Sequence, residues 1–183
     1  MAIEHLYLTS TAHSVAHFAD PDMRGNFDLE PPYQRGQVWG TARKVALIES
    51  VLRGVPIGAL IINDRLTASE RGGPSVPVDA PCYAVIDGKQ RITALRAFID
   101  SEFAVPASWF SEVDFDPDFL ASGDVDLDTA QVTYSVMSES FKRRFRRFPV
   151  ASSEGKLTSL AEEERVFDLI NFGGVPQGGS DLA

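Results

Sequence analysis

The stretch Cys82-Tyr83-Ala84-Val85-Ile86-Asp87-Gly88-Lys89-Gln90-Arg91 decides the fold of this chain. Its first half is small or apolar and predicts a buried strand, whereas residues 92–99 place apolar side chains at helical spacing. The turn between strand and helix carries one acid, one glycine, one amide and two cations. Because a helix N-terminus attracts anions through free N–H groups and a partial positive charge, the turn is a candidate binding site.

The chemistry of this turn fits two interpretations equally well. In the first, Gly88 lets the backbone approach a ligand, and Lys89 and Arg91 bind its phosphates. In the second, Asp87 caps the helix and the two cations face solvent. The turn alone does not distinguish these two interpretations, so the rest of the chain has to be considered.

Two further polar clusters accompany the turn. The first is Pro31-Pro32-Tyr33-Gln34-Arg35-Gly36-Gln37-Val38-Trp39, where the prolines enforce an extended entry and Trp39 is expected to anchor the loop. The second is Phe167-Asp168-Leu169-Ile170-Asn171-Phe172-Gly173-Gly174, where a predicted helix ends at two glycines. Taken singly, each is also typical of ordinary structure: a surface connection with one buried tryptophan, and a plain helix C-terminus.

Taken together and in this order, the three clusters resemble the N-terminal domain of GmrSD-type restriction enzymes, in the ParB and sulfiredoxin-like superfamily. The family pattern is a Pro-aromatic-Gln-Arg-x-x-x-Trp segment, an Asp-Gly-Gln-Gln-Arg turn and a Phe-x-x-Ile-Asn-x-Gly-Gly segment. The resemblance runs from about Phe27 to about Pro176, with Lys89 in place of the usual glutamine. It implies an α+β, ParB/sulfiredoxin-like fold with a small mixed sheet flanked by helices.

The resemblance also implies a function. Family members are mostly anti-phage or restriction proteins, and several bind or hydrolyse nucleoside triphosphates in this domain to gate DNA cleavage by a nuclease domain. We therefore expect a nucleotide-binding domain of phage defence or counter-defence, and leave open whether it hydrolyses the triphosphate. The expected partners are the nucleotide and a separate nuclease or defence protein; self-association is left open.

The motifs and the turn chemistry together assign roles to individual residues. The expected phosphate- or nucleotide-binding residues are Gln34, Arg35, Gly88, Lys89, Arg91 and Asn171. The expected catalytic residues are Asp87, Gln90 and Arg35. Asp87 would hold Mg²⁺ or orient a water, Gln90 would place that water, and Arg35 would offset charge on the transferred phosphoryl group. Arg35 and Arg91 are expected to face the same cavity.

Two functions from other classes stay open. A non-catalytic interaction or regulatory protein would keep the fold and the pocket, and the net charge of −9 favours it. A ParB-like DNA-binding or nicking protein rests on the basic run 142–147, which Phe141, Phe145 and Phe148 place on an amphipathic helix. The cations of that run can meet DNA, solvent or the acidic segment 112–128. The net charge predicts weak or absent DNA binding.

Composition indicates a soluble, cytoplasmic globular protein. Hydrophobic residues make up 44% of the 183 residues, no apolar run approaches the ~20 residues of a membrane span, and no secretory signal is visible. The single Cys82 excludes an intramolecular disulfide and is interpreted as a core residue. His13 and His17 are expected on one face of a half-exposed helix, and metal ligation is not expected. We expect one domain over residues 1–176 and a disordered tail over 177–183.

Periodicity and turn residues predict the remaining elements. The expected helices span residues 11–19, 43–52, 89–100, 134–148 and 159–171. The expected strands span residues 27–29, 56–62, 82–86 and 149–152. Segment 66–81 is expected to be a loop and segment 106–128 to be irregular. Ser159 and Glu162 predict a capping box at the start of the last helix.

Overall fold

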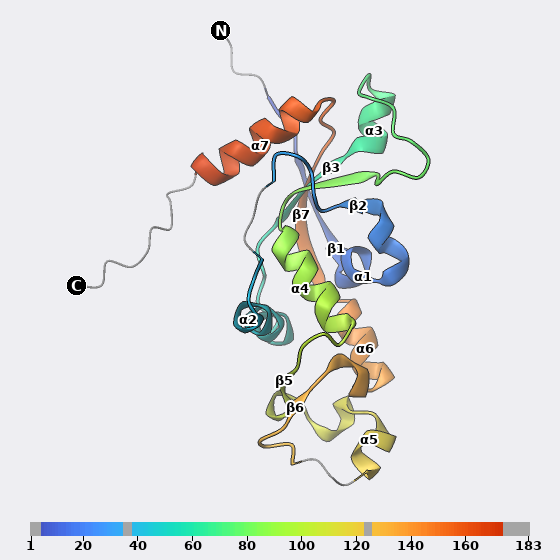
Figure 1. Cartoon of the computed structure of the whole chain (residues 1–183), viewed down its shortest axis with the longest axis vertical. Coiled ribbons are helices and arrows are strands. Elements are labelled where there is room, and N and C mark those ends of the chain that lie inside the picture. Colours follow the sequence, from blue (N-terminus) through green and yellow to red (C-terminus); the bar gives the residue numbers. More distant parts are fainter. Residues whose placement is uncertain (1–4, 35–37, 123–125, 174–183) are drawn as a thin grey trace, which may run out of the picture.

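The computed structural model describes residues 5–34, 38–122 and 126–173 (Figure 1). Its centre is a mixed five-stranded sheet in the order β1-β7-β3-β4-β2. These strands are β1 (Thr9–Ser14), β2 (Phe27–Asp28), β3 (Leu60–Asp64), β4 (Tyr83–Asp87) and β7 (Pro149–Gly155). Strand β4 is antiparallel to β3 and parallel to β2, while β7 is parallel to β3 and antiparallel to β1. A small antiparallel sheet pairs β5 (Val105–Pro106) with β6 (Gln131–Val132).

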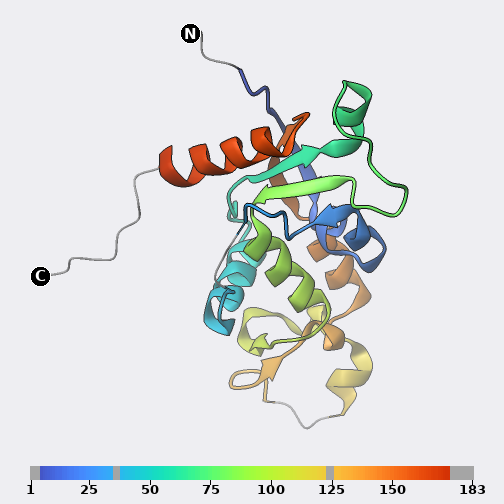
Figure 2. The ribbon, with the colours of Figure 1, turned by 45° about the horizontal axis from the view of Figure 1, so that its top comes forward.

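Seven α-helices surround the sheets in the described part of the chain. They are α1 (Val15–Ala19), α2 (Thr41–Leu52), α3 (Arg65–Glu70), α4 (Lys89–Ile99), α5 (Pro117–Ala121), α6 (Glu139–Arg146) and α7 (Leu160–Gly173). Short 3-10 turns occupy Pro21–Asn26, Ala107–Trp109, Glu112–Asp114 and Tyr134–Val136. Helix α4 packs between α1 and α2, whereas α7 lies apart from them beside β4 (Figures 1 and 2). None of these helices is long and apolar enough to cross a membrane.

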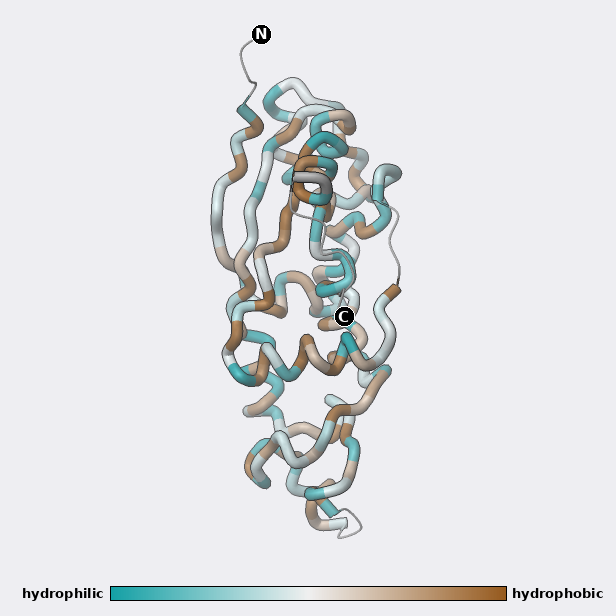
Figure 3. The backbone as a smooth tube through the Cα atoms, turned by 90° about the vertical axis from the view of Figure 1, so that its left-hand side faces the viewer, coloured by the Kyte–Doolittle hydropathy of each residue, from teal (hydrophilic) through white to brown (hydrophobic). Residues whose placement is uncertain are grey.

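The central sheet buries both of its faces, because successive side chains of a strand point to opposite sides. Val85 of β4 joins the main core with helices α1, α2, α4 and α6, whereas the next residue, Ile86, packs with Leu157 and Val166 beneath α7. In Figure 3, hydrophobic positions occur along the strands of the central sheet as well as on the helices that cover it. Helix α7 is therefore fastened to the sheet by a second and much smaller apolar cluster.

The structure confirms the predicted fold class, an α+β arrangement with a small mixed sheet flanked by helices. The strand–turn–helix stretch is also confirmed, as β4 and α4 with Gly88 between them. The expected helices over 43–52 and 159–171 correspond to α2 and α7. The predicted tail over 177–183 lies outside the described residues.

The expected helix over residues 11–19 is wrong in its first half. Residues 9–14 form β1, which pairs with β7 along its whole length, and only Val15–Ala19 is helical. Threonines at positions 9 and 11 suit an edge strand, and the sheet partner, which local periodicity does not show, decides the outcome. His13 and His17 thus lie on different elements, although their rings stack with centroids 4.2 Å apart.

Other boundaries differ for local reasons. The expected helix over 134–148 is reduced to α6, because the Ser138 side chain accepts a hydrogen bond from the Phe141 N–H and starts the helix there. The expected loop over 66–81 contains α3, which Asp64 caps by accepting from the Thr67 N–H. Cys82 is only partly buried and precedes β4, so its assignment to the core is wrong.

Candidate functional site

Three segments that are distant in sequence meet at the start of α4. They enclose a pocket of about 240 Å³. Its lining residues are Gln34, Trp39, Asp87, Gly88, Lys89, Gln90, Arg91, Phe167 and Asn171. The structure thus brings the three sequence clusters together, including every described residue that was predicted to belong to the site.

Gly88 fixes the backbone of the turn. Its φ of +102° lies in the left-handed region that favours glycine, and a Cβ atom there would lie 2.2 Å from Cδ2 of Leu60. Gly88 is also the N-cap of α4 and makes no side-chain cap, so the first N–H groups of the helix remain for a ligand or for water. The alternative interpretation, in which Asp87 caps the helix, is therefore wrong.

Asp87 instead pairs with Arg91. Its Oδ2 accepts from an Nη2–H of Arg91 at 2.8 Å, and Nη1 of the same guanidinium donates to the Ile57 carbonyl at 3.0 Å. The Arg91 side chain is only 14% exposed. Arg91 therefore ties the turn to the segment before β3 in addition to lining the pocket, and it has fewer free N–H groups for a phosphate than its sequence position suggests.

Lys89 is also paired. Its Nζ lies 2.6 Å from Oε1 of Glu30, on the segment that precedes the two prolines. The lysine side chain is 15% exposed and the glutamate side chain 77% exposed. Together Asp87 and Glu30 offset the charges of Arg91 and Lys89, so this end of the pocket is close to neutral in net charge.

The two glutamines of the site have different partners. Gln90 Oε1 accepts from the Trp39 N–H at 3.1 Å, which fastens the second cluster to α4. Gln34 Nε2 donates to the Ile86 carbonyl at 3.3 Å, but its buried Oε1 has no hydrogen-bond partner among the described residues. A buried acceptor without a donor is unfavourable, so Gln34 Oε1 is a polar atom that the described residues leave unsatisfied.

Helix α7 supplies the remaining wall. Phe167 packs against Tyr33 with ring centroids 5.6 Å apart, and Asn171 Nδ2 donates to the Phe167 carbonyl at 2.8 Å. That bond leaves the Asn171 amide oxygen available at the pocket. Arg35 lies outside the described residues, so the prediction that it faces the same cavity as Arg91 is not tested.

Asp87 is the only acidic residue that lines the described pocket, and the described residues hold no cluster of three metal-ligating side chains. Such a site resembles those in which Mg²⁺ is held by one or two carboxylates and mainly by the phosphates of the substrate. One oxygen of Asp87 already accepts from Arg91, and its other oxygen has no partner among the described residues. The free oxygen of Asp87 could therefore supply one ligand to a Mg²⁺ ion whose other ligands come from outside the protein.

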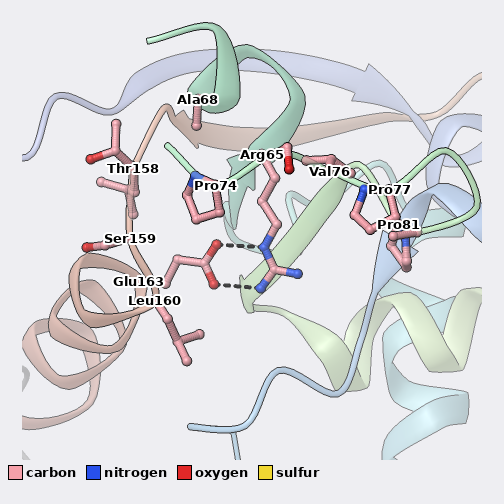
Figure 4. Close-up of a pocket in the computed structure, with 13 residues that line it drawn as sticks. Arg65, Ala68, Pro74, Val76, Pro77, Pro81, Thr158, Ser159, Leu160 and Glu163 are labelled. Atoms are coloured by element: carbon pink, nitrogen blue, oxygen red, sulfur yellow. Dashed lines mark hydrogen bonds and ion pairs between the residues drawn. The ribbon is translucent and has the colours of Figure 1, made fainter. Parts of the chain in front are cut away.

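A buried carboxylate next to this pocket was missed by the sequence analysis. Glu163 of α7 is 2% exposed and accepts four hydrogen bonds. The donors are Asn63 Nδ2 at 2.8 Å, Arg65 Nε at 2.8 Å, Arg65 Nη2 at 2.7 Å and the Tyr33 hydroxyl at 3.1 Å. Figure 4 shows the two parallel bonds from Arg65, whose Nη1 also reaches Asp28 at 2.9 Å. The sequence did not predict this network, because its members are far apart along the chain and each is an ordinary polar residue in its own segment.

The protonation states in this network follow from burial and charge. Burial raises the pKa of Tyr33, and the neighbouring Glu163 raises it further, so the hydroxyl remains a hydrogen-bond donor. The hydrogen bonds to Glu163 raise the pKa of Arg65 against the opposing effect of burial. The network therefore keeps a neutral phenol and a charged guanidinium over the physiological range.

A second pocket of about 290 Å³ lies above the Arg65–Glu163 pair, between α3, the proline-rich segment that follows it and the start of α7 (Figure 4). Its walls are mainly apolar, from Ala68, Pro74, Val76, Pro77, Pro81 and Leu160. The two charged residues that line it, Arg65 and Glu163, bind each other, and neither is left for a polar ligand. This pocket is accordingly mainly apolar, and its uncharged polar groups are the hydroxyls of Ser75, Thr158 and Ser159.

Comparison with known proteins identifies the class of domain to which this site belongs. The chain matches the family described as GmrSD restriction endonuclease, N-terminal domain, over residues 18–183. The chain therefore belongs to this family, as its three motifs indicated. No curated protein and no solved structure matches it.

Proposed function

We propose that this chain is a nucleotide-binding domain with a restriction-related role in phage defence, and that its ligand is a nucleoside triphosphate bound at the start of α4. The observation that carries the proposal is the meeting of the three motif segments around one pocket at a helix N-terminus. Family membership supports the restriction-related role. Free N–H groups and nearby cations are the groups that a phosphorylated ligand would use.

The pocket volume limits how the ligand would sit. Pockets that enclose a drug-sized ligand measure about 300–1,000 Å³, and this one is smaller. The proposed ligand would therefore place one end in the pocket, and the rest would extend across the open side. The phosphates would lie at Gly88, Lys89 and Arg91, beside the free N–H groups at the start of α4.

Hydrolysis is the further part of the proposal. Asp87 would hold Mg²⁺ through its free oxygen, and the metal, when bound, would neutralise charge on the phosphates. Gln90 would place the attacking water, Arg35 would offset the developing charge, and Asn171 would close the pocket from α7. A non-catalytic sensor is the second candidate, because the ion pairs on Lys89 and Arg91 leave little free positive charge for transition-state stabilisation.

The test is calorimetric titration with the four ribonucleoside triphosphates in Mg²⁺, followed by a phosphate-release assay. At least one triphosphate should bind with one site per chain. Lys89→Ala should weaken binding by about ten-fold or more, since a hydrogen bond to a charged group contributes roughly 1.5–3 kcal/mol. The matched control is Lys142→Ala on α6, which removes an equal charge far from the pocket.

Each outcome selects one function. Binding with phosphate release that Asp87→Asn abolishes supports the hydrolase, and binding without release supports the sensor. If folded protein gives no heat of binding with any of the four triphosphates, the nucleotide proposal is overturned. The non-catalytic interaction protein would then be the remaining candidate function. Equal losses of triphosphate affinity in Lys89→Ala and Lys142→Ala would show that the ligand does not bind in the pocket at α4.

A further inference from the structure

The Glu163 carboxylate joins four separate parts of the fold. Its donors come from the segment before Gln34, from β3, and from the first residue of α3, while the glutamate itself belongs to α7. Asn63 also binds the chain just before α7, because its Oδ1 accepts from the Leu157 N–H and its Nδ2 donates to the Leu157 carbonyl. A buried carboxylate with all of its hydrogen bonds satisfied fixes the relative positions of its donors.

Two of these parts carry walls of the pocket at α4. Tyr33 directly precedes Gln34, and Glu163 lies one helical turn before Phe167 and two turns before Asn171. The bond from the Tyr33 hydroxyl to Glu163 and the contact between Tyr33 and Phe167 hold these two walls against each other. No side chain of the network lines the pocket at α4 itself.

Helix α7 depends on this carboxylate because its apolar attachment is small. Among residues 160–171, only Glu163 and Val166 are buried, and Leu169 is 59% exposed. Helix α4, by contrast, buries Ile92, Leu95 and Phe98 completely. Apolar burial therefore sets the place of α4, whereas α7 needs directional bonds to fix where Phe167 and Asn171 stand.

We propose that Glu163 is a positioning residue for the pocket at α4: through Arg65, Asn63 and Tyr33 it holds α7 and the Gln34 segment at the separation that a ligand requires. The part of this proposal that concerns ligand affinity rests on the proposed nucleotide function. The part that concerns the shape of the pocket does not, and it is tested without any ligand.

The informative variant is Glu163→Gln. A carboxylate offers acceptors on both oxygens, whereas an amide offers one acceptor oxygen and one NH₂ donor. Either orientation of the amide places its NH₂ against an N–H of Arg65, because Arg65 donates to both oxygens of Glu163. The guanidinium cannot become an acceptor, so Arg65 and α7 must move apart although the side-chain volume is unchanged.

The ligand-free readout is fluorine NMR of protein labelled with fluorotryptophan. The chain has two tryptophans: Trp39 lines the pocket at α4, and Trp109 lines a separate pocket with Phe110 and Arg144. In Glu163→Gln the Trp39 resonance should shift or broaden while the Trp109 resonance stays. The control is Val132→Ala, which removes buried side-chain volume from β6 at the other end of the molecule. This variant should affect the Trp109 resonance more than the Trp39 resonance.

The second readout is triphosphate affinity, measured well below the melting temperature of each variant. Glu163→Gln should weaken binding by about ten-fold or more, since small displacements of binding groups are costly. Val132→Ala should leave the affinity unchanged even if it lowers the melting temperature as much as Glu163→Gln does. Tyr33→Phe, which removes one of the four hydrogen bonds, should fall between wild type and Glu163→Gln in both readouts.

The outcomes separate this inference from the proposed function. The positioning role is overturned if the Trp39 resonance is unchanged in folded Glu163→Gln. It is also overturned if Glu163→Gln and Val132→Ala lose affinity to the same extent for the same drop in melting temperature. A shifted Trp39 resonance in a protein that binds no triphosphate in any form supports the positioning role and rejects the nucleotide as its ligand.

Discussion

At the scale of single residues, the Lys89–Glu30 pair controls how much positive charge the pocket offers. A phosphate group would have to replace Glu30 at Lys89 Nζ, which lies 2.6 Å from the glutamate oxygen. We predict that Glu30→Gln raises triphosphate affinity by up to about five-fold, because ion pairs with an exposed member contribute about 0.2–1 kcal/mol. Calorimetric titration measures the change.

A double-mutant cycle provides the control for this prediction. In a Lys89→Gln background, which restores the amide usual in the family, the Glu30→Gln substitution should have no further effect on affinity. Glu139→Gln, which frees Lys142 on α6 in the same way, should also change nothing. If Glu30→Gln raises the affinity equally with and without Lys89, the effect comes from the overall charge of the protein and not from the Lys89–Glu30 contact.

His17 makes the stability of the fold depend on pH. Burial lowers the pKa of His17, the stacked His13 lowers it further, and Glu154 partly opposes both. A histidine with a lowered pKa binds fewer protons when folded than when unfolded, so stability is retained above pH 6.5 and lost as the pH falls below it. We predict a melting temperature that falls between about pH 7 and pH 5, and less steeply in His17→Phe.

A second variant for that measurement alters the neighbouring contact between His13 and Glu154. His13 Nε2 lies 2.5 Å from Glu154 Oε1, so Glu154→Gln should make the stability fall more steeply with acid, because it removes the charge that favours protonated His17. A melting temperature that depends on pH equally in wild type and in His17→Phe would assign the effect to other groups.

Single residues also show where sequence reasoning stops. The turn residues 87–91 were predictable, because a strand, a glycine and a helix follow one another and define the turn locally. Glu163 was not, because its donor Asn63 is 100 positions away and neither residue is unusual in its own segment. The ion pairs that occupy Lys89 and Arg91 were also unpredicted, since the sequence shows the cations but not which acids lie beside them.

At the scale of elements, the same division holds. Helices α2, α4 and α7 were predicted because their apolar spacing or their ends are encoded within the element. Strand β1 was mistaken for helix because its place at the edge of the sheet is decided by β7, more than 130 residues later. Strand β3 was predicted too early in the chain, and the segment before it is instead fixed by Arg91.

Helix α6 shows how an element's charges are used within the chain. Arg144 pairs with Asp114, Arg146 lies near Asp20, and Lys142 pairs with Glu139. Arg143 and Arg147 are exposed and have no such partner among the described residues. Pairing with the acidic segment is thus seen at Asp114, and two cations of the basic run remain for any external anion.

We predict that the isolated protein binds duplex DNA weakly or not at all at physiological salt. The net charge of −9 repels the duplex, and two free cations release few counterions. Fluorescence anisotropy over a range of salt concentrations measures affinity and salt slope. Tight binding that replacement of Arg143, Arg144 and Arg147 by Ser abolishes would instead support the DNA-binding alternative.

At the scale of the whole molecule, the described part of the chain is elongated, with α7 toward one end and the small β5–β6 sheet toward the other (Figures 1 and 2). Most of the apolar core joins the sheet to α1, α2, α4 and α6, and α7 is held separately by its small cluster and by Glu163. Regions with few buried apolar contacts open at a lower free energy than the core does. The molecule therefore has a stable body and one weakly attached helix that completes the pocket.

We predict that hydrogen exchange reports this division. The backbone amides of α7 should exchange at least about 100-fold faster than those of α4 in the free protein, because only Glu163 and Val166 are buried among residues 160–171. Saturating triphosphate should slow exchange in α7 and at the start of α4, since a ligand that bridges both adds its binding free energy to the docked state. Helix α6 should be unaffected and serves as the control. Protection of α4 without α7 in a protein that binds triphosphate would show that the ligand does not reach Phe167 and Asn171, and that α7 has another role.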